Sequence, residues 1–154
     1  DGEDEQAQRR LRLFCIHDEG QSPQVFEKQL EALLSDDPRL RAHFDLGFAE
    51  GPLRMASSDA SPNDLANCAI FGGEPCRWYR VERLGELCEE RVGLREALDL
   101  VIEEFASGSW NGVCGSGQGG TLAALMAKSA EDGHPALRDK LRFVLSLNAT
   151  WPRR

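Results

Sequence analysis

The chain has 154 residues, 41% of them hydrophobic, which is the length of one domain with enough apolar surface for a real core. Its formal net charge of -8 at pH 7 argues against nucleic acid and against an anionic membrane as binding partners. No run approaches the roughly 18 consecutive apolar residues of a membrane span. We therefore expect a soluble chain, or one attached at the periphery of a membrane complex.

Cysteine usage and the first residues bear on the compartment. The five cysteines, at 15, 68, 76, 88 and 114, have no C-x-x-C spacing, so a zinc site is not expected, and no other metal or cofactor is predicted. Their odd number favours a reducing compartment, and only Cys68 and Cys76 are placed to form a disulfide. Without a signal-peptide pattern, we expect an intracellular protein, in the cytoplasm or in an organelle after removal of a transit peptide.

The first third of the chain alternates predicted strands and helices. Residues 1–10 form a polar N-terminal tail, and Leu11–Ile16 is an apolar strand run. A helix is predicted over 25–34, where apolar residues recur at helical spacing, and a strand is predicted over 44–48. This alternation is typical of units in which helices cover a parallel sheet.

The middle of the chain is less regular. Residues 53–76 are rich in Ser, Asp, Asn, Gly and Pro and are predicted to form a long loop with one short helical turn at 63–68. A charged segment follows, and then the clearest helix of the chain is predicted over 92–105, with its apolar residues on one face.

The stretch 110–128 predicts a strand, a tight glycine turn and a helix. Val113-Cys114 ends a short buried strand, and strong helix formers run from Thr121 to about Ala130. Two kinds of site use this geometry. A nucleophile elbow exposes a side chain at a strained turn, whereas a phosphate cradle offers backbone N–H groups at a helix N-terminus.

The elbow pattern G-x-S-x-G fits the spacing of this turn but not its central residue. Gly115 and Gly119 take the outer positions, and Gly117 takes the place of the nucleophile. Ser116 could replace it only after a register shift, which would put the bulky Gln118 where a small residue is required.

The cradle pattern G-x-G-x-x-G matches Gly115, Gly117 and Gly120. This pattern is expected to be followed, after the next strand, by an acidic residue. The next predicted strand, 141–147, ends in Asn148 instead. A single glycine pattern of this kind is weak support for a phosphate site.

The order of the motifs resembles that of the family serine hydrolases (FSH), which are small α/β-hydrolases. In that family the first strand ends in L-H-G-F, a Val-Phe pair opens the first helix, the second strand ends near Ala-Pro, a Trp-containing segment precedes a helix, and the elbow is G-F-S-Q-G. The corresponding stretches here are Leu13–His17, Val25-Phe26, Phe48–Pro52, Arg77–Tyr79 and Gly115–Gly119. The resemblance implies an α/β fold, a three-layer sandwich with a short, mainly parallel sheet. It would be a truncated α/β-hydrolase fold in a single domain over 11–152.

The departures from the family pattern fall on the catalytic positions. The resemblance implies that the nucleophilic Ser corresponds to Gly117, which has no side chain that could attack. The loop that shapes the oxyanion hole appears as His17-Asp18-Glu19, whose two carboxylates would repel an oxyanion. The family places its catalytic Asp and His after the strand that corresponds to 141–147, and neither occurs here. His43 and His134 are expected in solvated loops.

Three hypotheses about function follow. The first is a catalytically inactive serine-hydrolase-like domain that acts as a structural or accessory subunit of a larger protein assembly. The second is a small-molecule or phosphate-binding protein that uses the turn at 115–120. The third is an active esterase of the FSH type that uses Ser116, or residues outside this sequence.

The strand at 141–147 is a predicted interface. The resemblance implies that this strand lies outermost in the sheet, where the family has two further strands that are absent here. An apolar edge strand with unpaired backbone groups is a template for another chain. We therefore predict a protein partner in a larger complex, contacted through Leu141, Phe143, Leu145, Leu147 and Trp151.

Overall fold

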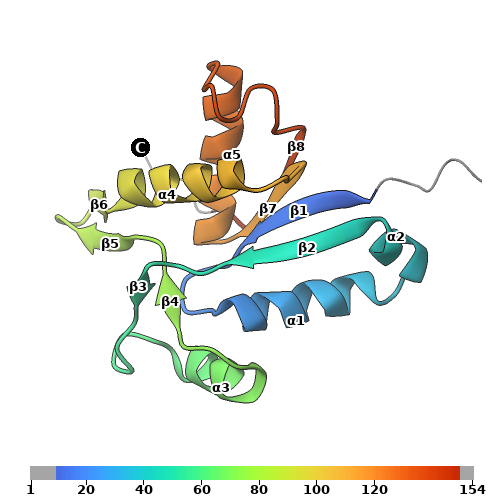
Figure 1. The fold of residues 1–154 in the computed structure, drawn as a ribbon. Coiled ribbons are helices and arrows are strands. Elements are labelled where there is room, and N and C mark those ends of the chain that lie inside the picture. Colours follow the sequence, from blue (N-terminus) through green and yellow to red (C-terminus); the bar gives the residue numbers. More distant parts are fainter. Residues whose placement is uncertain (1–9, 150–154) are drawn as a thin grey trace, which may run out of the picture.

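A four-stranded parallel sheet lies at the centre of the computed structural model, which describes residues 10–149 (Figure 1). The strands follow the order β2-β1-β7-β8, and all three pairings are parallel. Their bounds are Leu11–Ile16 for β1, Phe44–Ala49 for β2, Gly112–Ser116 for β7 and Phe143–Leu147 for β8. The prediction that the strand within 141–147 lies outermost is confirmed for the described sheet. Leu141 precedes the strand, while Trp151 and most of the predicted tail lie outside the described residues.

Helices cover both faces of this sheet, so the predicted three-layer arrangement is confirmed (Figure 1). Side chains alternate along β1: Leu13 and Cys15 pack toward α1, whereas Phe14 and Ile16 pack toward α4 and α5. These helices, with the short α2 that follows α1, span Pro23–Leu34 (α1), Pro38–Ala42 (α2), Leu94–Ser107 (α4) and Gln118–Glu131 (α5). None of the helices within residues 10–149 is long and apolar enough to cross a membrane.

The prediction of a long loop over 53–76 is wrong in its middle part. This segment contains the helix α3 (Pro62–Phe71) between two short paired strands, β3 (Leu53–Arg54) and β4 (Cys76–Arg77). The helix begins with a capping box, in which Ser61 Oγ accepts from Asp64 N and the Asp64 carboxylate accepts from Ser61 N. The Ser-Pro-Asn-Asp run that resembled loop composition is therefore a helix start signal.

Cys68 and Cys76, the two cysteines that the sequence allowed to form a disulfide, are not paired. Both thiols are buried and free: Cys68 lies on α3 and its Sγ donates to Gly20 O at 4.0 Å, while Cys76 Sγ donates to Glu74 O at 3.3 Å. All five cysteines are unpaired, and Cys88 is the exposed one. Helix α3 is therefore attached to the sheet domain by packing and hydrogen bonds rather than by a covalent link.

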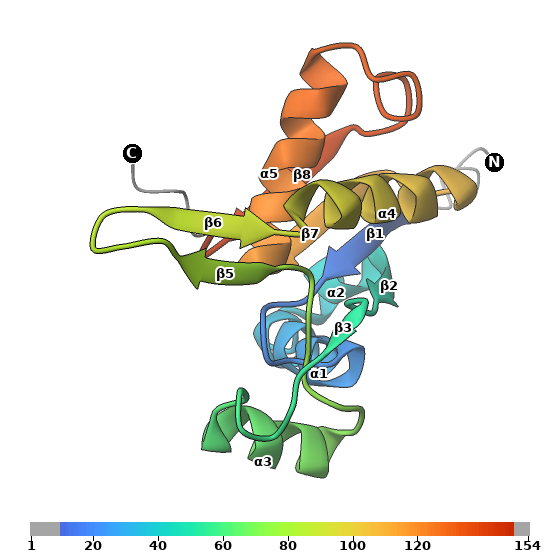
Figure 2. The same ribbon diagram turned by 90° about the vertical axis from the view of Figure 1, so that its left-hand side faces the viewer.

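The charged segment after Tyr79 forms a two-stranded hairpin that projects from the body of the domain (Figure 2). It consists of β5 (Arg80–Arg83) and β6 (Glu89–Val92), which pair antiparallel. The hairpin delays α4 until Leu94, two residues after its predicted start, because Gly93 makes the turn between β6 and α4 with φ +87. Leu87 at the hairpin tip is 96% exposed.

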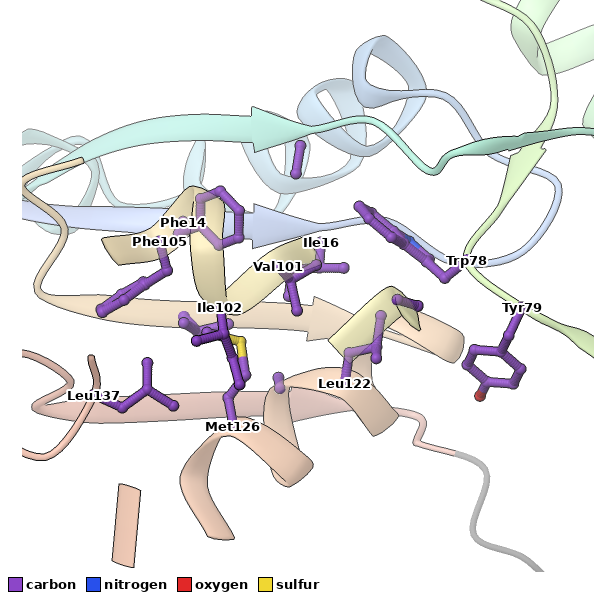
Figure 3. Packing of buried hydrophobic residues seen from close by; sticks show 14 residues of the cluster. Phe14, Ile16, Trp78, Tyr79, Val101, Ile102, Phe105, Leu122, Met126 and Leu137 are labelled. Atoms are coloured by element: carbon purple, nitrogen blue, oxygen red, sulfur yellow. The ribbon is translucent and has the colours of Figure 1, made fainter. Parts of the chain in front are cut away.

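The larger of two hydrophobic clusters fills the space between the sheet and helices α4 and α5 (Figure 3). Trp78 and Tyr79, which follow β4, are almost fully buried at the right-hand end of the cluster in Figure 3. Burying each such aromatic side chain removes on the order of 150–250 Å² from water. This cluster fixes α5 against β7, and with it the turn that joins them.

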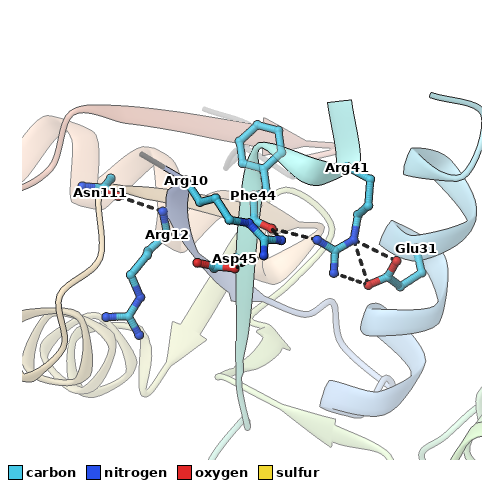
Figure 4. A network of polar contacts seen from close by, with 7 residues as sticks. All are labelled: Arg10, Arg12, Glu31, Arg41, Phe44, Asp45 and Asn111. Carbon is cyan, nitrogen blue, oxygen red and sulfur yellow. Dashed lines mark hydrogen bonds and ion pairs between the residues drawn. The ribbon is translucent and has the colours of Figure 1, made fainter. Parts of the chain in front are cut away.

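Polar contacts hold the opposite end of the sheet (Figure 4). Arg41 donates to the Glu31 carboxylate at 2.8 Å and to Phe44 O at 2.7 Å, and so joins α1 to the start of β2. On the other side of β1, Asn111 accepts from Arg12 N at 2.7 Å through its side-chain oxygen. Asn111 therefore connects β1 to the start of β7.

A candidate active site at the glycine elbow

Gly117 alone makes the turn between β7 and α5. Its φ of 56° and ψ of −118° belong to a region that residues with a side chain rarely adopt. Gly117 N donates to Leu147 O at 2.9 Å, and Thr121 N donates to Gly117 O at 3.0 Å, so the turn is bonded to both β8 and α5. This is the strained strand-to-helix turn of a nucleophile elbow.

The surrounding glycines permit close packing of α5 on the sheet. A Cβ on Gly115 would overlap the backbone of Gly119, and a Cβ on Gly119 would overlap the carbonyl group of Ile16. A Cβ on Gly120 would lie 2.7 Å from Leu147 O. The glycine pattern that resembles a phosphate cradle is thus explained by helix packing at Gly115 and Gly120 and by the backbone conformation of Gly117.

The carboxylate of Asp18 occupies the space beside the elbow where a nucleophile would stand. A Cβ built on Gly117 would overlap both carboxylate oxygens of Asp18. Asp18 Oδ1 accepts from Gln118 N at 2.9 Å and from Glu19 N at 2.6 Å. In an enzyme with a nucleophile elbow, two backbone amides bind the oxyanion. One belongs to the residue after the nucleophile, here Gln118, and the other to a strand-to-helix loop, here Glu19. The sequence predicted that Asp18 and Glu19 would repel an oxyanion. In the structure, the Asp18 carboxylate itself occupies the place of the oxyanion.

Electrostatics around this carboxylate are mixed. Burial raises the pKa of Asp18 above its usual range, the two backbone N–H donors lower it, and Asp64 raises it further. Burial also raises the pKa of Glu19, which Arg77 opposes across 3.7 Å. Arg77 also lies 3.9 Å from Asp59. Acidic groups thus surround the elbow, with one nearby guanidinium.

His17 is completely buried and both of its ring nitrogens are engaged. Nδ1 lies 2.7 Å from Asp18 O, and Nε2 accepts from Gly51 N at 2.9 Å. This pairing assigns a neutral ring that carries its proton on Nδ1. Burial lowers the pKa of His17, which favours the same neutral state. His17 therefore shapes the loop, as the resemblance implied, and has no free nitrogen for general base catalysis.

The other two histidines lie far from the elbow, and both are partly exposed as expected. His43 precedes β2 at the opposite end of the sheet. His134 follows α5, whose 14 residues separate it from Gly117 by about 21 Å along the helix. Ser116, the alternative nucleophile, ends β7 and makes no described hydrogen bond to a histidine. Within residues 10–149, no three metal-ligating side chains gather into a possible metal site.

Gln118 has a role that sequence reasoning missed. Its buried side chain accepts from Trp78 N at 3.0 Å through Oε1, and donates to Tyr79 O at 2.9 Å through Nε2. Trp78 Nε1 in turn donates to His17 O at 2.9 Å. The Gln of the elbow motif thus attaches the Trp-Tyr segment to the turn. The signal for this in the sequence was the pair of large aromatic residues at 78–79.

Two of the predicted interface residues, Leu145 and Leu147, line a small apolar cavity on the α1 face of the sheet. Leu145 and Leu147 are 45% and 38% exposed, whereas Phe143 is half-buried. The cavity measures about 110 Å³, and its lining consists of Leu13, Leu30, Leu33, Leu34, Phe44, Leu46, Cys114, Leu145 and Leu147. Strand β8 therefore presents an apolar surface that helix α1 does not cover.

Sequence comparison agrees with the geometry of the elbow. A family model described as Serine hydrolase (FSH1) matches residues 7–154. The chain is 29% identical to esterase OVCA2 of Bos taurus and 28% identical to esterase OVCA2 of Homo sapiens, with 96% of this chain aligned in each case. It is also 27% identical over 81% of its length to a dihydrofolate reductase of Schizosaccharomyces pombe.

These matches, together with the parallel sheet and the glycine elbow, show the class of the protein, which is an α/β-hydrolase-like fold, and the family. The chain belongs to the FSH1 serine hydrolase family. It spans 67% of the length of each OVCA2 esterase and 27% of the fission-yeast protein.

The buried His17 predicts a pH dependence of stability. Because burial lowers its folded-state pKa below the ordinary value of 6.5, the unfolded chain takes up a proton more readily. Its contribution to stability is complete above about pH 6.5 and is lost as the pH falls toward the folded-state pKa. Urea midpoints between about pH 7.5 and pH 5 should show this decline.

His17→Gln removes the titrating ring, so it should flatten this decline while lowering stability at neutral pH. His43→Gln is the matched control and should keep the slope of the unmodified chain. If His17→Gln retains the slope, the decline belongs to other groups and the assignment of a neutral, buried His17 is wrong.

Gly117→Ala predicts a stability loss that depends on Asp18. The change adds backbone strain of roughly 1–3 kcal/mol and an overlap with the Asp18 carboxylate. Gly85→Ala is the matched control, since Gly85 has φ +139 but no atom within 4 Å of a built Cβ. We expect Gly117→Ala to cost at least about 1 kcal/mol more than Gly85→Ala in chemical denaturation.

In an Asp18→Ala background the overlap is gone, so the extra cost of Gly117→Ala should shrink by roughly 0.5–3 kcal/mol, the range of coupling between contacting residues. Strictly additive effects of the two substitutions would mean that Asp18 does not stand where the nucleophile would be.

Proposed function

We propose that this chain is a catalytically inactive FSH-family domain that acts as an accessory subunit in a larger protein assembly. One observation carries the first part: the nucleophile position of the elbow is Gly117, and the Asp18 carboxylate fills the space beside it. The site thus has neither a nucleophile nor room for one.

None of the three histidines in this sequence is placed to act as a general base at the elbow. Both nitrogens of His17 are engaged, and His43 and His134 lie away from the elbow. In a serine hydrolase the nucleophile and base act as a unit, and removing that unit costs on the order of 10⁶ in turnover. Hydrolysis by what remains would be negligible.

The phosphate-binding alternative has less support. Its strongest donor, the N–H of Gln118, already bonds to a carboxylate at 2.9 Å. Further carboxylates, those of Glu19 and Asp64, act on Asp18 or lie beside it, so a phosphate would meet negative charge. The active esterase remains the second candidate, because two relatives are named esterases.

The subunit role rests on strand β8. This strand is the edge of the described sheet and carries no Pro and no charged residue. Exposed leucines on β8 and α1 border the apolar cavity beside it, and Leu33 is 66% exposed. Unprotected edge strands of this kind add strands from other chains, and the cavity offers a place for an apolar side chain of the partner.

Esterase assays test the catalytic part of the proposal. We expect the purified chain to hydrolyse short p-nitrophenyl esters no faster than its heat-denatured form, because no activated nucleophile exists. A fluorophosphonate probe should leave Ser116 unlabelled. Turnover that Ser116→Ala abolishes would establish the active esterase instead.

Substitutions beside β8 test the subunit role. Leu145→Lys and Leu33→Lys place charge on the apolar surface, so the native-size assembly in extracts of the source organism should weaken by roughly tenfold or more. Leu87→Lys, at the exposed hairpin tip, is the matched control and should assemble normally.

Hydrogen exchange gives an independent readout of the same edge. Amides in 143–147 should exchange more slowly in the assembly than in the isolated chain. If the chain is a monomer in those extracts, or if the 143–147 amides are equally protected in the isolated chain, the subunit role fails.

A further inference from the structure

We propose that Asp18 is a built-in ligand of the oxyanion site, a carboxylate that the chain itself supplies and that closes the elbow to other anions. Asp18 Oδ1 accepts from Gln118 N at 2.9 Å and from Glu19 N at 2.6 Å. The inference rests on the proposed function in one respect, namely that position 117 carries no nucleophile. It goes further by stating what occupies the site.

The loop that carries Asp18 is fixed by contacts that do not involve its carboxylate. Asp18 N donates to Gln21 Oε1 at 3.1 Å, and Gln21 N donates back to Asp18 O at 3.2 Å. Gly20 and Gln21 bond to the backbone of Cys76 on β4, at 2.9 and 3.0 Å. His17 Nδ1 also contacts Asp18 O at 2.7 Å. Removal of the carboxylate should therefore leave the loop and its two N–H donors in place.

Positions 18 and 117 exclude one another. A Cβ on Gly117 and the Asp18 carboxylate would require the same volume, so the acid can reach the two amides only when position 117 is glycine. The FSH pattern that this chain resembles has the opposite arrangement, with Gly in the loop and Ser at the elbow. With Asp18 in place of the loop Gly and Gly117 in place of the elbow Ser, the site that would bind an oxyanion of the substrate is filled by a side chain of the protein.

The charges around the elbow explain why the Asp18 carboxylate binds the two N–H donors although a free anion would not. Glu19 is adjacent in sequence, Asp64 raises the pKa of Asp18, and Arg77 is the nearby cation that offsets them. A free anion must overcome this field and lose translational freedom, whereas Asp18 is held by the chain. Unmodified protein should therefore not bind small carboxylates at the elbow.

Asp18→Ala tests the inference, because it leaves a vacant pair of donors at a partly exposed position. Formate is the probe, titrated against chloride at constant ionic strength, and the amide resonances of Gln118 and Glu19 are followed by NMR. We expect a saturable shift of both amides in Asp18→Ala and none in the unmodified chain. Glu19→Ala is the matched control, since it removes a neighbouring carboxylate but keeps Asp18, and it should not respond to formate.

A folded Asp18→Ala that shows no saturable response, or an unmodified chain that responds equally, would overturn the inference. If Asp18→Ala does not fold, two measurements still decide. In the unmodified chain the Gln118 and Glu19 amides should titrate together with the Asp18 carboxyl group, and separately from the Glu19 carboxyl group and the His17 ring. In the isosteric variant Asp18→Asn this titration should disappear. Gln118 and Glu19 amide resonances that do not follow the Asp18 titration in the unmodified chain would refute the contact.

These outcomes are independent of the esterase result. If the unmodified chain hydrolyses esters through Ser116, the proposed function is wrong whatever formate does. If formate fails to bind Asp18→Ala while the unmodified chain remains inactive, only the built-in ligand is wrong.

Discussion

The close approach of α5 to the sheet is the constraint on which the rest of this structure depends. Glycines at 115, 119 and 120 let the first turn of the helix pack on β7, β1 and β8 without a Cβ between them. That packing forces the chain through a single strained residue, Gly117. An elbow of this kind is expensive to form, by roughly 1–3 kcal/mol when its residue has a side chain, and glycine lowers this cost.

The buried polar groups around the elbow are hydrogen-bonded to one another, and these bonds connect several segments of the chain. His17, Gln118 and the backbone of Trp78 and Tyr79 bond to one another at depths where unpaired groups would cost about 1–3 kcal/mol each. In an active hydrolase some donors near the nucleophile must stay available for the substrate. Here the Asp18 carboxylate accepts from two of them, so the geometry of the elbow persists while these two donors are already bonded within the chain.

Local sequence patterns predicted much of this fold. Features of the site that the sequence did not predict depend on contacts between residues far apart in the chain. Apolar periodicity located the four sheet strands and helices α1, α4 and α5 to within a few residues, and the motif order gave the strand order. The start of α3 was missed because Ser61 and its neighbours were weighed as composition rather than as a capping signal. The contact of Asp18 with Gln118 joins residues 100 positions apart, which no local pattern in one sequence can indicate.

The hairpin β5–β6 has a practical consequence for chemistry at sulfur. Thiolates react and thiols do not, so a cysteine needs access to solvent and a pKa that burial has not raised. Burial raises the pKa of Cys15, Cys68 and Cys76, and that of Cys114 to about 11. Cys88 is exposed at the end of the hairpin. A maleimide dye or a spin label would therefore attach there first, and the sequence already offers a reporter position on the projecting hairpin.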